Sequence, residues 1–218
     1  DFGPNDCDST SASRQAAIKN YRRCVPHYTL QKEGQDEALY HAFTVGRVRF
    51  VIPDLKAEML NDGEMMSSEQ MHWFLSEIRN AHNYALVVLA LGVPWNSDSS
   101  GWGAHSEDRA TISQTILEMY QNHTSSSSSS LGGHANIIGI AGDAHMLAFD
   151  DGTNSHGEIP IIQAAPLEMI GSAKIDVTTS GTSSFVVLSL SLFLSFFLSP
   201  LQQPTQPTNR MLRLQRKF

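Results

Sequence analysis

Apolar runs of strand length that alternate with amphipathic segments constrain the fold of this 218-residue chain most strongly. The strand-like runs lie near residues 43–53, 85–91 and 136–141, and helix-like segments near 67–81 and 106–121 separate them. Within the first run, Gly46-Arg47 is expected to form a tight turn or a bulge. This order predicts an α/β layered domain. The uninterrupted run at 85–91 suits a strand that is covered on both faces. If the three strands run parallel, their carboxyl ends reach one edge of the sheet, where open α/β sheets usually place their sites.

The helices have recognisable signatures. Ser67, followed three residues later by Gln70, is a capping box that opens a helix. A further helix is expected from about Ser13 to Cys24, with Ala16, Ala17 and Tyr21 toward the core, and a further strand over 159–165. The expected buried stripes are Met71, Phe74, Leu75 and Ile78 on the helix at 67–81, and Ile112, Ile116 and Met119 on the helix at 106–121.

Charge and cysteine content narrow the functional classes. The formal net charge of −7 argues against a nucleic-acid-binding surface, so no nucleic-acid partner is expected. Cys7 and Cys24 are the only cysteines, and two cysteines do not define a disulfide framework. The length is sufficient for one domain with a substantial hydrophobic core.

The turn Gly142-Asp143-Ala144-His145 directly follows the strand-like run 136–141 and carries the strongest chemical signal. A carboxylate and an imidazole two residues apart offer one oxygen and one nitrogen ligand, which suits a pair of adjacent metal ions. The alternative is ordinary Gly-Asp turn chemistry. Asp54 and Trp95 follow other strands and are expected to line the same cleft, or to serve only as a loop cap and as a loop anchor packed on the core.

Four segments, in order, are similar to one family. They are the loop Asp1-Phe2-Gly3-Pro4-Asn5-Asp6, the stretch from Phe43 to Asp54, the helix start Gln70-Met71-His72-Trp73, and the turn Gly142-Asp143-Ala144-His145. Together, across roughly residues 1–165, they resemble the PhoD-like metallophosphatases, which form the alkaline phosphatase D family. The loop resembles the end of the family's Trp-Asp-Asp-His-Asp motif, and the turn resembles its Gly-Asp-Val-His motif.

The resemblance implies a four-layer metallophosphatase sandwich of two mixed sheets flanked by helices. It also implies metal-dependent hydrolysis of small phosphate monoesters or diesters, in which the metal ions activate a water molecule for attack on phosphorus. Asn5 and Asp143 would hold the second metal through oxygen, His145 would hold the first through nitrogen, and Asp54 and His145 would be catalytic. Iron with calcium is one pairing found in the family. From the residues alone, Asn5 is simply a turn residue.

The family's earlier metal ligands lie before its Asp-His loop. The resemblance therefore implies that residues 1–183 form a partial metallophosphatase domain that is incomplete at its amino end, with a low-complexity insert at 124–133. A non-catalytic, truncated product is the alternative function.

The carboxyl-terminal part of the sequence has a different composition. Within the apolar segment 184–201, Phe185 to Leu201 carry no charge over 17 residues, which is the lower limit for a membrane span. Its serines alternate with apolar residues, which instead suits a buried strand or an aberrant sequence. Residues 202–218 are expected to be a disordered basic tail. A membrane-attached phosphatase-like protein is thus a third hypothesis, and the location stays open between secreted and membrane-associated.

Overall fold

The computed structural model describes residues 9–34, 36–59, 63–124 and 136–164. The chain divides into two units, Asp1–Phe185 and Val186–Phe218, and every described residue belongs to the first. Asn5, most of the insert at 124–133, the apolar segment 184–201 and the tail 202–218 therefore lie outside the described residues.

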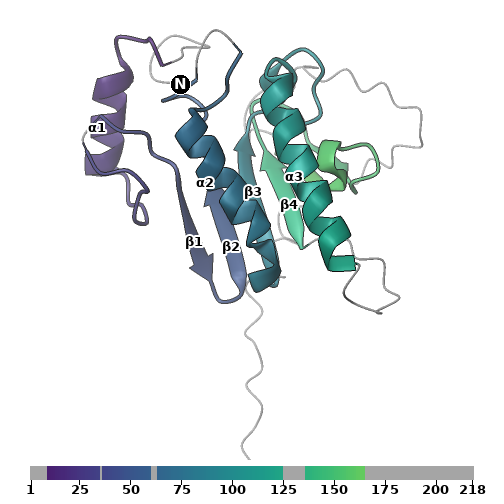
Figure 1. Cartoon of the computed structure of the whole chain (residues 1–218). Coiled ribbons are helices and arrows are strands. Elements are labelled where there is room, and N and C mark those ends of the chain that lie inside the picture. The colour runs from purple at the N-terminus through teal and green to yellow at the C-terminus, as the bar shows by residue number, and fades with distance from the viewer. Residues whose placement is uncertain (1–8, 35, 60–62, 125–135, 165–218) are drawn as a thin grey trace, which may run out of the picture. The chain divides into compact units, whose positions relative to one another are not determined.

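The described residues form a mixed α/β fold around a six-stranded sheet (Figure 1). The sheet order is β1-β2-β3-β4-β6-β5; β2, β3, β4 and β6 run parallel, and β1 and β5 are antiparallel strands at the two edges. The strands are β1 (His41–Val45), β2 (Val48–Ile52), β3 (Leu86–Gly92), β4 (Ile137–Ala141), β5 (Ala148–Asp150) and β6 (Ile161–Gln163). The helices are α1 (Arg14–Cys24), α2 (Ser68–Arg79) and α3 (Ser106–Thr124), with short 3-10 turns η1 (Ala81–Asn83), η2 (Gly101–Gly103) and η3 (His156–Glu158). The predicted α/β order is confirmed.

The segment 43–53 folds as a hairpin in which Val45 pairs with Val48, and the two-residue loop between them is Gly46-Arg47. Of the two predicted alternatives at this position, the structure has the tight turn and not the bulge. Gly46 begins that loop with φ 60°, a conformation that glycine adopts without a steric penalty. The short strand β5 was not predicted, because three residues carry too little periodicity to be recognised.

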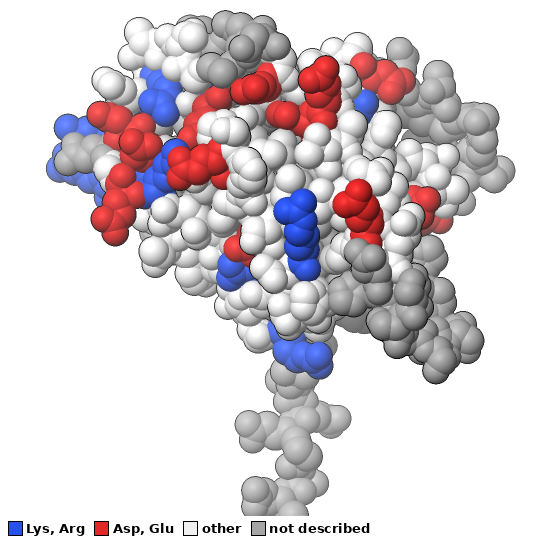
Figure 2. Space-filling model, viewed as in Figure 1, with Lys and Arg blue, Asp and Glu red and all other residues white. Residues whose placement is uncertain are grey.

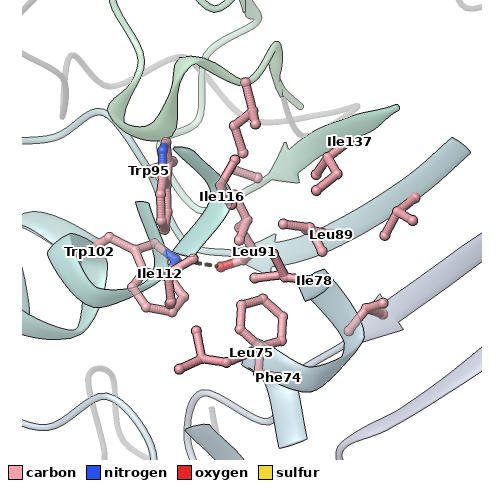
Figure 3. Packing of buried hydrophobic residues seen from close by; sticks show 14 of the residues in the cluster. Phe74, Leu75, Ile78, Leu89, Leu91, Trp95, Trp102, Ile112, Ile116 and Ile137 are labelled. Atoms are coloured by element: carbon pink, nitrogen blue, oxygen red, sulfur yellow. Dashed lines mark hydrogen bonds between the residues drawn. The ribbon is translucent and has the colours of Figure 1, made fainter. Parts of the chain in front are cut away.

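Helices α2 and α3 lie side by side over one face of the sheet (Figure 1). Each helix connects two neighbouring parallel strands, and both crossovers step across the sheet in the same direction, so both helices reach the same face. Strand residues on this face are buried: Val51, Val87, Leu89, Leu91, Ile137, Ala141 and Ile161. Phe74, Leu75, Ile78, Ile112, Ile116 and Met119 meet them from the helices, which confirms most of both predicted stripes (Figure 3). Met71 is only partly buried.

The opposite face carries the alternate strand residues, which are less completely covered. Leu86 and Ala90 are half-buried although they belong to the run expected to be covered on both faces, while Val88 between them is buried. At one side of this face Tyr28 stacks on Phe43 with ring centroids 3.9 Å apart. None of the helices in the described residues is long and apolar enough to cross a membrane.

The prediction for the buried side of α1 was wrong at Ala16, which is exposed. Ile18 is the buried residue and packs with Ala38, Tyr40 and Ala57 in a small separate cluster. The helix is also held by Arg14, whose Nε donates to the carbonyl of Ala57 at 2.6 Å. Apolar periodicity does not detect an anchor of this kind, because the residue that makes it is charged.

Gly139 in the middle of β4 leaves space that its neighbours fill. A Cβ at this position would lie 2.5 Å from Cδ1 of Ile161 and 2.7 Å from Cδ1 of Leu91. We expect Gly139→Val to lower the free energy of unfolding by about 1–3 kcal/mol through overpacking, as measured by urea denaturation. Thr44→Val on the exposed edge strand is the control and should change it by less than about 0.5 kcal/mol. An unchanged midpoint for Gly139→Val would contradict the packing described for β4.

Candidate functional site

The carboxyl ends of β2, β3 and β4 lie along one edge of the sheet because these strands pair in parallel. Asp54, Trp95 and the turn Gly142-Asp143-Ala144-His145 each follow one of these strands, as predicted. The backbone joins two of the three ends directly, since the N–H of Gly142 donates to the carbonyl of Gly92 at 3.0 Å.

The ends of β3 and β4 both reverse through three-residue turns. The N–H of Val93 donates to the carbonyl of Leu91 at 2.6 Å, and the N–H of Ala144 donates to the carbonyl of Gly142 at 2.8 Å. Gly92 and Asp143, the central residues, have φ 65° and 68°, which makes both turns γ-turns of the rare positive-φ type. Glycine adopts this conformation readily, whereas an aspartate held there stores strain of about 1–3 kcal/mol.

The turn after β4 presents two donor side chains toward the surface. His145 also has a positive φ, 53°, and Asp and His are among the non-glycine residues enriched in this region. Ala144 between them is fully buried, whereas Asp143 is exposed and His145 is half-buried. The buried methyl group of Ala144 therefore anchors the centre of the turn between two more accessible residues.

The two donors fit part of a cation site. An oxygen donor beside a nitrogen donor suits a first-row divalent metal ion. Within the described residues, however, no group of three or more His, Cys, Asp or Glu side chains is arranged so that it could hold a metal ion, and catalytic zinc sites usually have three protein ligands. Asn5, the third predicted ligand, lies outside the described residues. The chemistry of the donors therefore fits, and the described turn supplies two of them.

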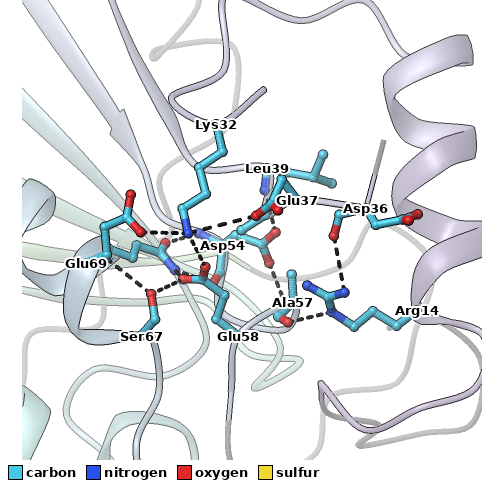
Figure 4. A network of polar contacts seen from close by, with 12 residues as sticks. Arg14, Lys32, Asp36, Glu37, Leu39, Asp54, Ala57, Glu58, Ser67 and Glu69 are labelled. Atoms are coloured by element: carbon cyan, nitrogen blue, oxygen red, sulfur yellow. Dashed lines mark hydrogen bonds and ion pairs between the residues drawn. The ribbon is translucent and has the colours of Figure 1, made fainter. Parts of the chain in front are cut away.

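Asp54 organises the turn that follows β2. Its Oδ2 accepts the N–H of Leu39 at 2.7 Å, and its Oδ1 accepts the N–H groups of Lys56 and Ala57 at 3.1 and 2.9 Å (Figure 4). These three bonds occupy both carboxylate oxygens, which matches the predicted alternative of a loop cap. The catalytic role of Asp54 stays a prediction.

Gln70 links α2 to this turn. Its Oε1 accepts the N–H of Asp54 at 2.6 Å, and its Nε2 donates to the carbonyl of the same residue at 3.1 Å. The predicted cap is present, because the Oγ of Ser67 accepts the N–H of Gln70 at 3.3 Å. The side chain of Gln70 does not return to the backbone of Ser67 as a capping box requires, since the β2 turn takes its hydrogen bonds.

A charged network that the sequence did not reveal supports the same end of β2 (Figure 4). Nζ of Lys32 lies 3.3 Å from a carboxylate oxygen of Glu58 and 2.9 Å from one of Glu69. Oε2 of Glu58 also accepts hydrogen bonds from Oγ of Ser67 at 2.5 Å and from Nε2 of Gln70 at 2.9 Å. Lys32 and Glu58 are 26 residues apart in charged loops, so no local pattern pairs them.

The network shifts two titrations. Burial by itself would raise the pKa of Glu58, but the hydrogen bonds from Ser67 and Gln70 and the charge of Lys32 outweigh it and hold the pKa below its ordinary value of 4.5. The hydrogen bond to Glu69 raises the pKa of Lys32 against the opposing effect of burial. Both groups therefore stay charged at neutral pH.

The loop after β3 is packed into the core. Trp95 is 1% exposed and meets Trp102 edge to face (Figure 3). Its Nε1 donates to the carbonyl of His156 at 3.0 Å. Nη1 of the buried Arg109 donates to the carbonyls of Trp95 and Ser97 at 2.9 and 2.6 Å. Burial lowers the pKa of His156, and the nearby charge of Arg109 lowers it further. Trp95 is therefore the core anchor of the two predicted alternatives.

Acidic side chains gather over the end of the molecule at which α2 and α3 begin, as Figure 2 shows. Exposed acidic residues in the segments that follow β2, β3 and β4 include Glu64, Glu69, Asp98, Glu107 and Asp143. We call these residues the acidic rim. Their negative charge raises the local concentration of cations and repels anions that are not bound to a cation.

No protein-family model matches this sequence, and no curated protein matches it. The resemblance to the PhoD-like metallophosphatases rests on the four motifs alone. Two of these motifs are in contact, because the side chain of Gln70 in the motif that begins with Gln70 hydrogen-bonds the backbone of Asp54, which ends the motif from Phe43 to Asp54. The first motif lies outside the described residues, and the fourth is the turn after β4.

The lowered pKa of Glu58 predicts a pH dependence of folding. Its ionised form stabilises the folded state at every pH above the unfolded value near 4.5, and that stabilisation is lost as the pH falls through the lower pKa of the folded state. We expect Glu58→Gln to be less stable than the wild type at pH 7 and to lose less stability on acidification below pH 4.5. Thermal unfolding from pH 7 to pH 3 measures both effects.

The exposed loop residue Glu33 provides the matched control for this experiment. Glu33→Gln makes the same chemical change outside the network and should follow the wild-type pH profile. Parallel profiles for Glu58→Gln and the wild type would contradict a stabilising role for the ionised Glu58.

Proposed function

We propose that this protein takes part in metal-dependent hydrolysis of phosphate esters, as an alkaline phosphatase or phosphodiesterase, at the carboxyl edge of β2, β3 and β4. The observation that carries the proposal is the turn after β4, in which Asp143 and His145 both have positive φ and flank the buried Ala144. Strained, non-glycine backbone at a strand end is typical of functional sites.

The acidic rim and the fold also support the proposal. A phosphate ester carries negative charge, so it approaches an edge lined by acidic side chains favourably only where a cation neutralises part of the charge. The described sheet, with α2 and α3 over one face, is compatible with one half of a four-layer sandwich. In this proposal residues 1–183 belong to such a metallophosphatase domain.

The residues of the turn have distinct proposed roles. Asp143 donates a carboxylate oxygen and His145 an imidazole nitrogen, with Asn5 as a further oxygen donor, and iron with calcium is the pairing that the resemblance implies. Bound ions would supply Lewis-acid activation of water and charge neutralisation of the phosphate. The hydrogen bond from Gly142 to Gly92 keeps both donors at the edge shared with β3.

The alternative is a chain that does not catalyse hydrolysis. The observation that favours it is the donor count, because the described residues contain no group of three or more His, Cys, Asp or Glu side chains that could hold a metal ion. Activity measurements separate the two proposals directly.

We expect the purified chain to hydrolyse p-nitrophenyl phosphate or its bis ester when iron and calcium are supplied, and to lose this activity on adding a chelator. The ratio of the two rates gives the preference between monoesters and diesters. The non-catalytic alternative would be favoured if no p-nitrophenol were released, or if its release continued unchanged after the chelator was added.

Substitution of the turn residues tests the assigned ligands separately from turnover. We expect Asp143→Ala and His145→Ala each to weaken binding of Mn²⁺ by more than about 10-fold, because even groups that only orient a ligand commonly contribute 10–100-fold. Isothermal titration calorimetry measures the affinity. His72→Ala, on the exposed side of α2, is the control and should bind Mn²⁺ as the wild type does.

A further inference from the structure

Gln163 at the end of β6 is a polar side chain in an apolar position. Two residues after Ile161, it lies on the same face of the sheet, the one that α2 and α3 cover, and it is 3% exposed. A buried amide is costly unless its hydrogen bonds are made, so its partner identifies what the residue does. A glutamine at this register also marks a departure from the apolar pattern that is visible in the sequence.

The partner is the turn that carries the candidate ligands. Nε2 of Gln163 donates to the carbonyl oxygen of Gly142 at 2.6 Å. The same oxygen accepts the N–H of Ala144 at 2.8 Å, which is the bond that closes the turn around Asp143. One carbonyl group therefore receives both the internal bond of the turn and a bond from a neighbouring strand.

The backbone holds the surrounding segments on both sides. The N–H of Ala164 donates to the carbonyl of Ala141 at 2.8 Å, and the N–H of Gly142 donates to the carbonyl of Gly92 at 3.0 Å. These two bonds place β3, β4 and β6 side by side but leave the orientation of the Gly142 carbonyl unspecified. The amide of Gln163 specifies it, because a hydrogen-bond acceptor must point toward its donor.

We propose that Gln163 is a positioning residue of the candidate site: it fixes the Gly142 carbonyl and thereby holds Asp143 and His145 in the positive-φ turn. The inference rests on the proposed function for its connection to metal binding. Its geometric part, the orientation of the turn, stands on the hydrogen bonds alone. In this proposal the backbone of Asp143 and His145 is preorganised, so binding a cation does not have to order the turn first.

Gln163→Met tests the proposal because it keeps the length and removes the donor. Asn136→Met is the matched control at the opposite end of β4, where Nδ2 of Asn136 donates to the carbonyls of Ala81 and Tyr84 at 2.7 and 2.6 Å. Both variants lose a side-chain amide that binds backbone carbonyls, and only one of them lies next to the turn. Gln163→Glu is a second variant of the same size that also lacks the amide donor.

Two measurements on the full chain decide the outcome. Isothermal titration calorimetry with Mn²⁺ should show affinity weakened about 10–100-fold by Gln163→Met and Gln163→Glu and unchanged by Asn136→Met. Hydrogen exchange should show faster exchange of the Ala144 amide in both Gln163 variants than global unfolding accounts for, but not in Asn136→Met.

The two proposals fail in different ways. Wild-type protein that binds no Mn²⁺ would overturn the proposed function, and exchange of the Ala144 amide would still decide whether Gln163 holds the turn. The positioning inference would be overturned if the Gln163 variants matched Asn136→Met both in affinity for Mn²⁺ and in the exchange rate of the Ala144 amide. Gln163 would then have a purely structural role.

Discussion

The parallel pairing of β3 with β4 is the interaction on which the rest of the structure depends. It places Leu89 and Ile137 against α2 and α3, and the absent side chain of Gly139 makes room for Leu91 and Ile161. The same pairing brings two strand ends to one edge and joins them there through the bond from Gly142 to Gly92. Core and candidate site are thus built from the same pair of strands.

Different interactions stabilise the two ends of this edge. At β2, Asp54, Gln70, Glu58 and Lys32 hold the exit turn through charged and polar contacts. At β4, Gln163 and the buried Ala144 hold a turn whose central residue is strained. In both places a buried glutamine, Gln70 at β2 and Gln163 at β4, hydrogen-bonds the backbone of the segment that follows the strand.

The two faces of the sheet also differ in a way that matters for the fold. Parallel strands are usually covered on both faces, and the apolar residues on the face away from α2 and α3 fit that rule in composition. Leu86 and Ala90 are nevertheless half-buried, and Phe149 on β5 is 50% exposed. The described helices therefore account for one of the two apolar surfaces that the strands present.

The sequence by itself determined the alternation of the longer strands with α2 and α3, the break at Gly46-Arg47, the cap at Ser67, the apolar stripes of α2 and α3, and the turn after β4, because each depends on residues close together in the chain. Tertiary structure alone decided the anchoring of α1 by Arg14, the pairing of Lys32 with Glu58, and the contact of Gln163 with Gly142. It also decided the positive φ of Asp143 and His145. Periodicity reports which residues face a core, but a hydrogen bond or ion pair between distant segments exists only once strand register has brought its two partners together.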